Sequence, residues 1–299
     1  MIRPRHFGVN PQTAASNSFQ QADSTGAELA ARAAREVDDC AHALAAAGVT
    51  PLIFDDTDAP AKPDAVFPNN WVSFHASGRI VLYPMLAPNR RVERRPDILH
   101  ALTARGYRWH ETIDLSELER RGLALEGTGS LVFDRPRGFA FAALSSRTHR
   151  AALAEFAART GYRVLEFHTA FRGQPVYHTN VMLALGRQFA VICDEIIPAP
   201  AERDAVIAQL EASGRDVIRI DAGQMACFAA NLLELDAETG PVIALSTTAL
   251  AGLRTAQRRR LEAHGRLLPV AVPAVESDGG SLRCMLAEVF LPRAGSAGG

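Results

Sequence analysis

The 299-residue sequence has a single lysine, no CxxC pair and no run of 18 or more apolar residues. Without such a run the chain has no candidate transmembrane helix, and residues 1–19 lack the apolar stretch of a secretory signal. We therefore expect a cytoplasmic protein. The four cysteines, Cys40, Cys193, Cys227 and Cys284, are too far apart in sequence to indicate a zinc site or a disulfide framework. Each is expected to act as an individual thiol.

The chain also lacks an excess of charge of either sign. Its formal net charge is -1 and its sequence pI is about 6.8. No positive field is available to attract a phosphate backbone or an anionic lipid surface, which argues against nucleic acid and membranes as partners. Apolar residues make up 47% of the sequence, enough to bury a substantial core.

Apolar segments follow a repeating order of strand, turn, strand, helix and strand. The alternating and continuous apolar runs predict four pairs of strands, each followed by a helix. A further helix is expected at residues 25–47, ending at Gly48, and a short strand at residues 50–55. The predicted pairs, each with its helix, are 71–75 and 79–83 with 95–105, 131–133 and 138–143 with 148–160, 181–185 and 189–193 with 201–213, and 231–235 and 242–246 with 253–264.

Four or five such ββαβ units favour a closed, pseudo-symmetric α/β arrangement, since each unit exposes an apolar face that only a neighbour can cover. The loops would then converge on one shared pocket. A doubly wound parallel sheet is the competing interpretation, but the short connections within the strand pairs favour hairpins. No low-complexity linker divides the chain, so we expect a single domain over residues 1–299.

The segment SDGGSLRCMLAEVFL, residues 277–291, is the most informative for chemistry. Residues 285–291 are expected to form a strand, which would place Cys284 at a loop-to-strand junction next to Arg283. A neighbouring positive charge lowers the pKa of a thiol and makes it a better nucleophile. A buried structural cysteine fits the local sequence equally well.

Three further polar residues stand next to apolar runs or turns. His178 directly precedes an apolar segment, where an imidazole can transfer protons near neutral pH. Glu126 precedes a Gly-Thr-Gly turn, and Asp64 lies before Phe67 and Pro68. Taken singly, His178 is more typical of a surface residue, and Asp64 of a turn former.

Taken in order, PDAVFPNNW, LEGTGSL, SSRT, YHTNVM and GGSLRCMLAEVFL resemble the motifs of the guanidine-modifying superfamily. Its members are arginine deiminases, dimethylarginine dimethylaminohydrolases and amidinotransferases. The segment MACFAANLLEL at 225–235 is most similar to the bacterial branch described as citrulline-utilisation hydrolases. The resemblance covers residues 63–291 and implies the pentein fold, a five-bladed α/β propeller of ββαβ units.

The resemblance also implies roles for individual residues. Cys284 would be the nucleophile, His178 the general acid and base, and Glu126 the carboxylate that contacts the substrate nitrogen and steadies the histidine. The other residues implied to hold the substrate are Asp64, Asn70, Arg91, Arg147 and Asn180, with the two arginines on its α-carboxylate. Neither a metal nor an organic cofactor is required.

Two departures from the family pattern bear on the substrate. Relatives that act on guanidinium groups often carry carboxylates where Asn70 and Asn180 stand. An amide can donate to and accept from a neutral urea, whereas a carboxylate stabilises a cation. This favours citrulline, cleaved to ornithine, ammonia and carbon dioxide. Ala230, where glycine is expected, leaves the shape of the pocket open.

Several alternatives stay open from the sequence. An arginine deiminase or a dimethylarginine dimethylaminohydrolase would use the same residues on a guanidino group, and an amidinotransferase would pass that group to an amine. A binding module without turnover is a non-enzymatic alternative. The expected partner is a small ureido or guanidino amino acid, and a homodimer is compatible with the sequence.

Overall fold

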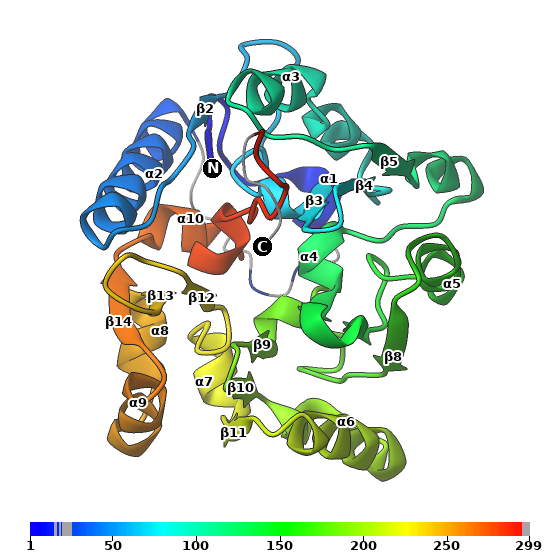
Figure 1. Ribbon diagram of the computed structural model, residues 1–299, viewed down its shortest axis with the longest axis vertical. Helices are drawn as coiled ribbons and strands as arrows, with labels where there is room; N and C mark the ends of the chain where they lie inside the picture. Colours follow the sequence, from blue (N-terminus) through cyan, green and yellow to red (C-terminus); the bar gives the residue numbers. More distant parts are fainter. Residues whose placement is uncertain (15–16, 18, 20–25, 295–299) are drawn as a thin grey trace.

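The computed structural model describes residues 1–14, 17, 19 and 26–294 of the chain. Within these residues the strands form five small sheets arranged around the centre of the molecule (Figure 1). One sheet pairs β1 (Ile2–Arg3) with β2 (Phe54–Asp55). The other four have three strands each: β3 (Val72–His75), β4 (Arg79–Leu82) and β5 (Glu111–Asp114); β6 (Val132–Asp134), β7 (Phe139–Ala143) and β8 (Arg163–Phe167); β9 (Leu183–Leu185), β10 (Phe189–Ile192) and β11 (Asp216–Arg219); β12 (Leu233–Leu235), β13 (Val242–Ser246) and β14 (Arg266–Val270).

Each three-stranded sheet has the same plan. Its first two strands form an antiparallel hairpin, as in β3 and β4, and the third strand runs parallel to the second. A parallel neighbour requires a crossover connection, which a helix supplies in every case. The predicted ββαβ units are therefore confirmed, and the doubly wound parallel sheet is excluded for these four sheets.

The helices differ in position and in length (Figure 1). The crossover helices, together with the long helix that precedes the first three-stranded sheet, lie on the outside. These are α2 (Ala27–Ala46), α3 (Pro96–Ala104), α5 (Arg150–Thr160), α6 (Pro200–Ala212) and α9 (Thr255–Glu262). Shorter helices are α1 (Pro11–Ala14), α4 (Gly127–Ser130), α7 (Ala222–Ala226), α8 (Thr247–Gly252) and α10 (Pro273–Ser277).

Most predicted elements appear within a few residues of their expected ends. Helix α2 ends at Ala46, two residues before Gly48. The φ of Gly48 is +87°, a conformation that glycine adopts without steric cost. The strand expected at residues 50–55 shortens to β2, because only its last two residues pair with β1.

One expectation was wrong. Residues 285–291 form no strand; a 3₁₀ turn, η7 (Leu282–Met285), is followed by an irregular segment that crosses the centre. Leu286 and Leu291 of this segment are buried against neighbouring apolar clusters. Its apolar character therefore reflects burial at the centre, not pairing in a sheet.

The core brings the two ends of the chain to the same place. One apolar cluster joins side chains of α2, α10, β13 and η7, and includes Cys284.

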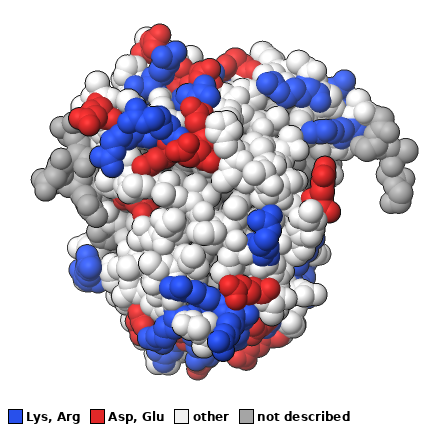
Figure 2. Space-filling model, turned by 90° about the vertical axis from the view of Figure 1, so that its left-hand side faces the viewer, with Lys and Arg blue, Asp and Glu red and all other residues white. Residues whose placement is uncertain are grey.

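At the surface, Figure 2 shows charges of both signs near the upper and lower ends of one side, with a largely uncharged area between them. In the described part of the chain, no helix is both long and apolar enough to cross a membrane.

Candidate active site

Cys284 lies in the 3₁₀ turn η7, where its side chain is buried. The side-chain amides of two asparagines approach its sulfur. Asn231 Nδ2 lies 3.3 Å from Sγ, and Asn180 Nδ2 lies 3.6 Å from it. The Oδ1 atoms of Asn231 and Asn180 lie 3.7 and 3.9 Å from Sγ, so each amide can donate to the sulfur or accept from its S–H.

Asn231 connects the segment before β12 to the turn that carries the cysteine. Its Oδ1 accepts a hydrogen bond from the backbone N–H of Arg283, and its Nδ2 also donates to the carbonyl of Asn180. Asn231 belongs to the segment MACFAANLLEL, but it was not among the site residues predicted from the sequence. The sequence signal for Asn231 is a single asparagine inside an apolar run. Such an asparagine is fully buried here, and a buried amide needs polar partners.

Arg283 does not face the thiol, contrary to expectation. Its guanidinium turns away, donating to the carbonyl of Leu286 at 2.9 Å and lying 3.7 Å from Glu288. Adjacent residues of a 3₁₀ turn point in different directions, so neighbours in sequence need not share an environment. Amide donors surround the sulfur instead.

His178 and Glu126 form a buried pair. His178 precedes the 3₁₀ turn η5 (Thr179–Val181), so β9 begins later than predicted, and Glu126 directly precedes α4. His178 Nε2 lies 2.9 Å from Glu126 Oε2. The two residues are 52 positions apart in sequence and meet through the packing of η5 against α4.

The protonation of this pair follows from its surroundings. Burial lowers the pKa of His178 to about 4, although Glu126 opposes the shift. Burial alone would raise the pKa of Glu126, but Arg147, His178 and Arg90 together hold it well below its usual range. An ionised carboxylate only accepts, so the neutral imidazole donates from Nε2 and keeps Nδ1 free to take a proton.

Gly129 makes a close approach to the imidazole possible. A Cβ at this position would lie 2.7 Å from His178 Nδ1 and 2.7 Å from Asn70 Nδ2. Only glycine lets α4 pack this closely against the histidine and the asparagine. Asn70 therefore lies beside His178, and its Nδ2 donates to Asn69 Oδ1 at 3.1 Å.

Two arginines extend the buried network from Glu126. Arg147 Nη1 lies 3.5 Å from Glu126 Oε2, and Arg90 Nη1 lies 3.4 Å from the same oxygen. Arg90 also binds both oxygens of Glu93 and lies 3.1 Å from Asp64 Oδ2. Asp64 thus joins the same network as His178.

Arg91 does not enter this network. It is partly exposed and contacts the carbonyls of Met85 and Leu86 and the carboxylate of Glu119. Its neighbour Arg90 is almost fully buried and takes the inward position. Both arginines lie in the 3₁₀ segment η2 (Pro88–Glu93), where the sequence gives no sign of which one points inward.

The N-terminal segment adds residues that the sequence analysis missed. Asn10 is buried, and its Nδ2 donates to Asp64 Oδ2 at 2.8 Å. The carbonyl of Thr13 accepts from Arg147 Nη2 at 3.2 Å. No motif marks these residues, because their contacts depend on partners more than 50 residues away.

The remaining cysteines have surroundings unlike that of Cys284. Burial raises the pKa of Cys40 and of Cys193 to about 12, which makes both thiols poor nucleophiles at neutral pH. Each packs in an apolar cluster. Among the described residues, no group of three or more His, Cys, Asp or Glu side chains could hold a metal ion.

The family model described as "N,N dimethylarginine dimethylhydrolase, eukaryotic" matches residues 3–291. Comparison with curated proteins finds no match. The match to the family model bears out the resemblance to the guanidine-modifying superfamily.

Solved structures share the fold at low sequence identity. Apo ArgZ, an arginine dihydrolase from the ornithine–ammonia cycle in cyanobacteria, aligns at 16% identity with a TM-score of 0.76, over 99% of this chain and 41% of ArgZ. The N-terminal domain of ArgZ, covalently bound to a reaction intermediate, aligns at 15% identity with a TM-score of 0.75, over 98% of both chains. A dimethylarginine dimethylaminohydrolase variant with an S-methyl-L-thiocitrulline adduct gives 14% identity and a TM-score of 0.64, over 95% of this chain and 96% of the other. The chain thus spans less than half of full-length ArgZ.

Proposed function

The chain belongs to the N,N-dimethylarginine dimethylhydrolase family, and from this membership we propose that it is a cysteine hydrolase cleaving a C–N bond of a guanidino amino acid. Cys284 is the nucleophile, His178 the general acid and base, and Glu126 the carboxylate that orients the imidazole. The buried His178–Glu126 pair and the amide donors at Sγ support these roles.

The observation that carries the substrate class is an unsatisfied oxygen on Asp64. Its Oδ2 has two partners, whereas its buried Oδ1 has no hydrogen-bond donor among the described residues. A buried carboxylate oxygen without a donor costs free energy, which a ligand can recover by supplying one. A guanidinium supplies planar N–H donors and a compensating charge.

The proposed reaction has two halves. His178 Nδ1 takes the proton of the Cys284 thiol, and the resulting thiolate adds to the guanidino carbon. The C–N bond then breaks as Nδ1 delivers that proton to the departing amine. Water then adds to the carbon of the covalent thiol intermediate while His178 takes its proton. The S–C bond breaks, and a ureido product and the free thiolate result.

Other residues hold the substrate in this proposal. Asp64 binds the guanidino nitrogens, and Asn70 and Asn180 orient the reacting group. Arg147 binds the α-carboxylate, for which its planar fork is suited. Such positioning against the thiolate contributes several kcal/mol to lowering the barrier.

Citrulline is the second candidate substrate. Cys284 Sγ lies within hydrogen-bond distance of the side-chain amides of Asn180 and Asn231, which carry no charge. An amide pair can both donate to and accept from a neutral ureido group. This would yield ornithine, ammonia and carbon dioxide by the same two-step route.

A substrate panel tests the proposal. Asymmetric dimethylarginine, arginine and citrulline are supplied separately, and dimethylamine, ammonia, citrulline and ornithine are measured. We expect turnover of a guanidino substrate and none with Cys284→Ala. Turnover of citrulline and of neither guanidino substrate would favour the second candidate. Product that forms only with an added amine would indicate an amidinotransferase. Full activity of Cys284→Ala would refute the mechanism.

For the whole chain we propose one domain over residues 1–299, whose five sheets are the blades of a pseudo-symmetric propeller. The shared order of the ββαβ units and their placement around one centre support this view (Figure 1). A cytoplasmic location and a homodimer stay predictions.

A further inference from the structure

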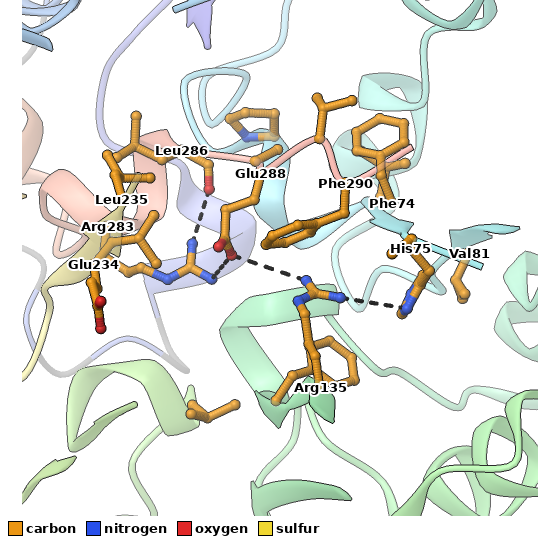
Figure 3. Close-up of a pocket in the computed structure, with 18 of the residues that line it drawn as sticks. Phe74, His75, Val81, Arg135, Glu234, Leu235, Arg283, Leu286, Glu288 and Phe290 are labelled. Carbon is orange, nitrogen blue, oxygen red and sulfur yellow. Dashed lines mark hydrogen bonds and ion pairs between the residues drawn. The ribbon is translucent and has the colours of Figure 1, made fainter. Parts of the chain in front are cut away.

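A cavity of about 1090 Å³ opens at the centre of the molecule, apart from the residues assigned to catalysis. The first strands of the four three-stranded sheets and the irregular segment 286–290 line it (Figure 3). Cys284, His178 and Glu126 are not among its lining residues. Its volume lies at the upper end of the range typical of small-molecule sites.

Arg135 is held in the wall of this cavity by aromatic rings. The carbon of its guanidinium lies 4.8 Å from the ring centroid of Phe133 and 4.4 Å from that of Phe290. Its Nη1 lies 3.4 Å from His75 Nδ1 (Figure 3). Stacking fixes the plane of the guanidinium and leaves its N–H edges available to an acceptor.

Two guanidiniums share one carboxylate here. Glu288 Oε2 lies 4.0 Å from Arg135 Nη2 and 3.7 Å from Arg283 Nη2, so it lies between the two arginines (Figure 3). Neither distance is that of a hydrogen bond. Two positive charges and one negative charge leave a local excess of one positive charge.

The other arginines that line the cavity are paired at shorter range. Each has a carboxylate oxygen within 3.3 Å: Arg79 with Glu111, Arg137 with Asp134, Arg187 with Glu234, and Arg215 with Asp134. Burial, together with Arg135 and Arg79, lowers the pKa of His75 to about 3, so this imidazole is neutral at pH 7. Arg137 and Arg215 also share one carboxylate, that of Asp134, but both lie within 3.3 Å of it, so Arg135 and Arg283 are the lining arginines whose carboxylate lies beyond hydrogen-bond distance.

The remaining wall near these arginines is apolar. Leu286 and Phe290 lie near the charged group, and Phe74 and Val81 lie near His75 (Figure 3). An anion that also carries an apolar body would satisfy the guanidinium edges and cover this surface at the same time. A planar carboxylate matches the fork of a guanidinium better than a spherical anion does.

We propose that this cavity, which Cys284 does not line, is a second ligand site that binds a small carboxylate with an aromatic body at Arg135 and Arg283, in competition with Glu288. Asn180, whose side chain lies 3.6 Å from Cys284 Sγ, also lines the cavity, but the residues on which the proposal depends, Arg135, Arg283 and Glu288, have no role in the proposed reaction.

Titration calorimetry on the full chain tests the ligand class. The probe is 1-naphthaleneacetate, compared with its neutral analogue 1-naphthaleneacetamide and with acetate. We expect one naphthaleneacetate per chain and affinities at least about tenfold weaker for both analogues, since hydrogen bonds to charged groups contribute most. Equal binding of the amide, or no binding of naphthaleneacetate at millimolar concentration, would overturn the proposal.

Variants test the location of the site. Arg135→Met should weaken naphthaleneacetate binding about tenfold or more. Glu288→Gln should strengthen it several-fold, because the competing carboxylate is removed, and this gain cannot result from misfolding. Arg163→Met is the matched control, since Arg163 stacks on Phe139 outside the cavity and should leave affinity unchanged. If Arg147→Met abolished binding while Arg135→Met did not, the probe would occupy the catalytic site and the proposal would fail.

Discussion

The thiol of Cys284 shows how single residues set the chemistry of this site. Amide groups, not a neighbouring guanidinium, surround its sulfur. An amide stabilises the thiolate through its N–H dipole and adds no net charge. The reactivity of this cysteine should therefore be sensitive to any charge introduced at Asn180 or Asn231.

Asn231→Asp tests this sensitivity. A carboxylate at this position can still accept from the Arg283 N–H, but it would lie near the sulfur and raise the pKa of the thiol by like-charge repulsion. Under the proposed mechanism we expect kcat/KM at pH 7 to fall about tenfold or more, since one pKa unit is a factor of ten in thiolate.

The pH profile separates this effect from simple damage to the fold. The acidic limb of the rate profile should move to higher pH in Asn231→Asp. A loss of activity that is uniform at every pH, with the limb unmoved, would show that the asparagine acts only as a structural support.

At the scale of elements, the candidate catalytic residues stand in or beside short turns, not in the regular strands. Cys284 lies in η7, His178 directly before η5, and Glu126 directly before α4. The strands and outer helices form the scaffold that presents these turns. Turns of three or four residues have little stability of their own, so tertiary contacts must hold them.

One such contact joins α2 to α10, the helix that leads into the cysteine turn. Both carboxylate oxygens of Glu36 accept from the N-terminal amides of α10, those of Ala274 and Val275. We expect Glu36→Ala to lower the free energy of unfolding by about 1–3 kcal/mol, because it leaves buried N–H groups unsatisfied. Urea denaturation measures the change.

Glu28→Ala on the same helix is the control for that measurement. Glu28 lies in the exposed first turn of α2, so its removal should change the unfolding free energy by less than about 0.5 kcal/mol. Equal effects of the two substitutions would mean that the loss comes from α2 itself and not from its contact with α10.

At the scale of the whole molecule, two buried neutral histidines link stability to pH. The pKa of His178 is lowered to about 4 and that of His75 to about 3, chiefly by burial. Between these values and about 6.5 the unfolded chain binds protons that the folded chain does not. The free energy of unfolding should therefore fall as pH drops from 6.5 toward 5, by up to about 1.4 kcal/mol per pH unit for each histidine.

His75→Gln isolates one of these contributions without touching the proposed catalytic residues. Chemical denaturation between pH 7 and pH 5 should show a shallower loss of stability than in the unsubstituted protein. Identical slopes for the two proteins would show that His75 binds its proton in the folded state.

The sequence by itself determined the hairpins, the order of the ββαβ units and the family. The hairpins and the order of the units rest on local patterns: alternation along strands, helical spacing, and turn residues between them. The family rests on the resemblance of the ordered motifs. It also supplied the residues with the right chemistry, including Cys284, His178 and Glu126. Their roles were implied by the resemblance, since residue type and immediate neighbours alone fitted a structural cysteine and a surface histidine as well or better.

Only the tertiary structure decided which side chains meet. Arg90 turns inward while Arg91 faces Glu119, and Arg283 faces Glu288 while amides approach the sulfur of Cys284. Side-chain direction in a 3₁₀ or irregular segment has no fixed period, unlike that in a strand. Segments distant in sequence set it through packing and hydrogen bonds, and no local pattern encodes those contacts.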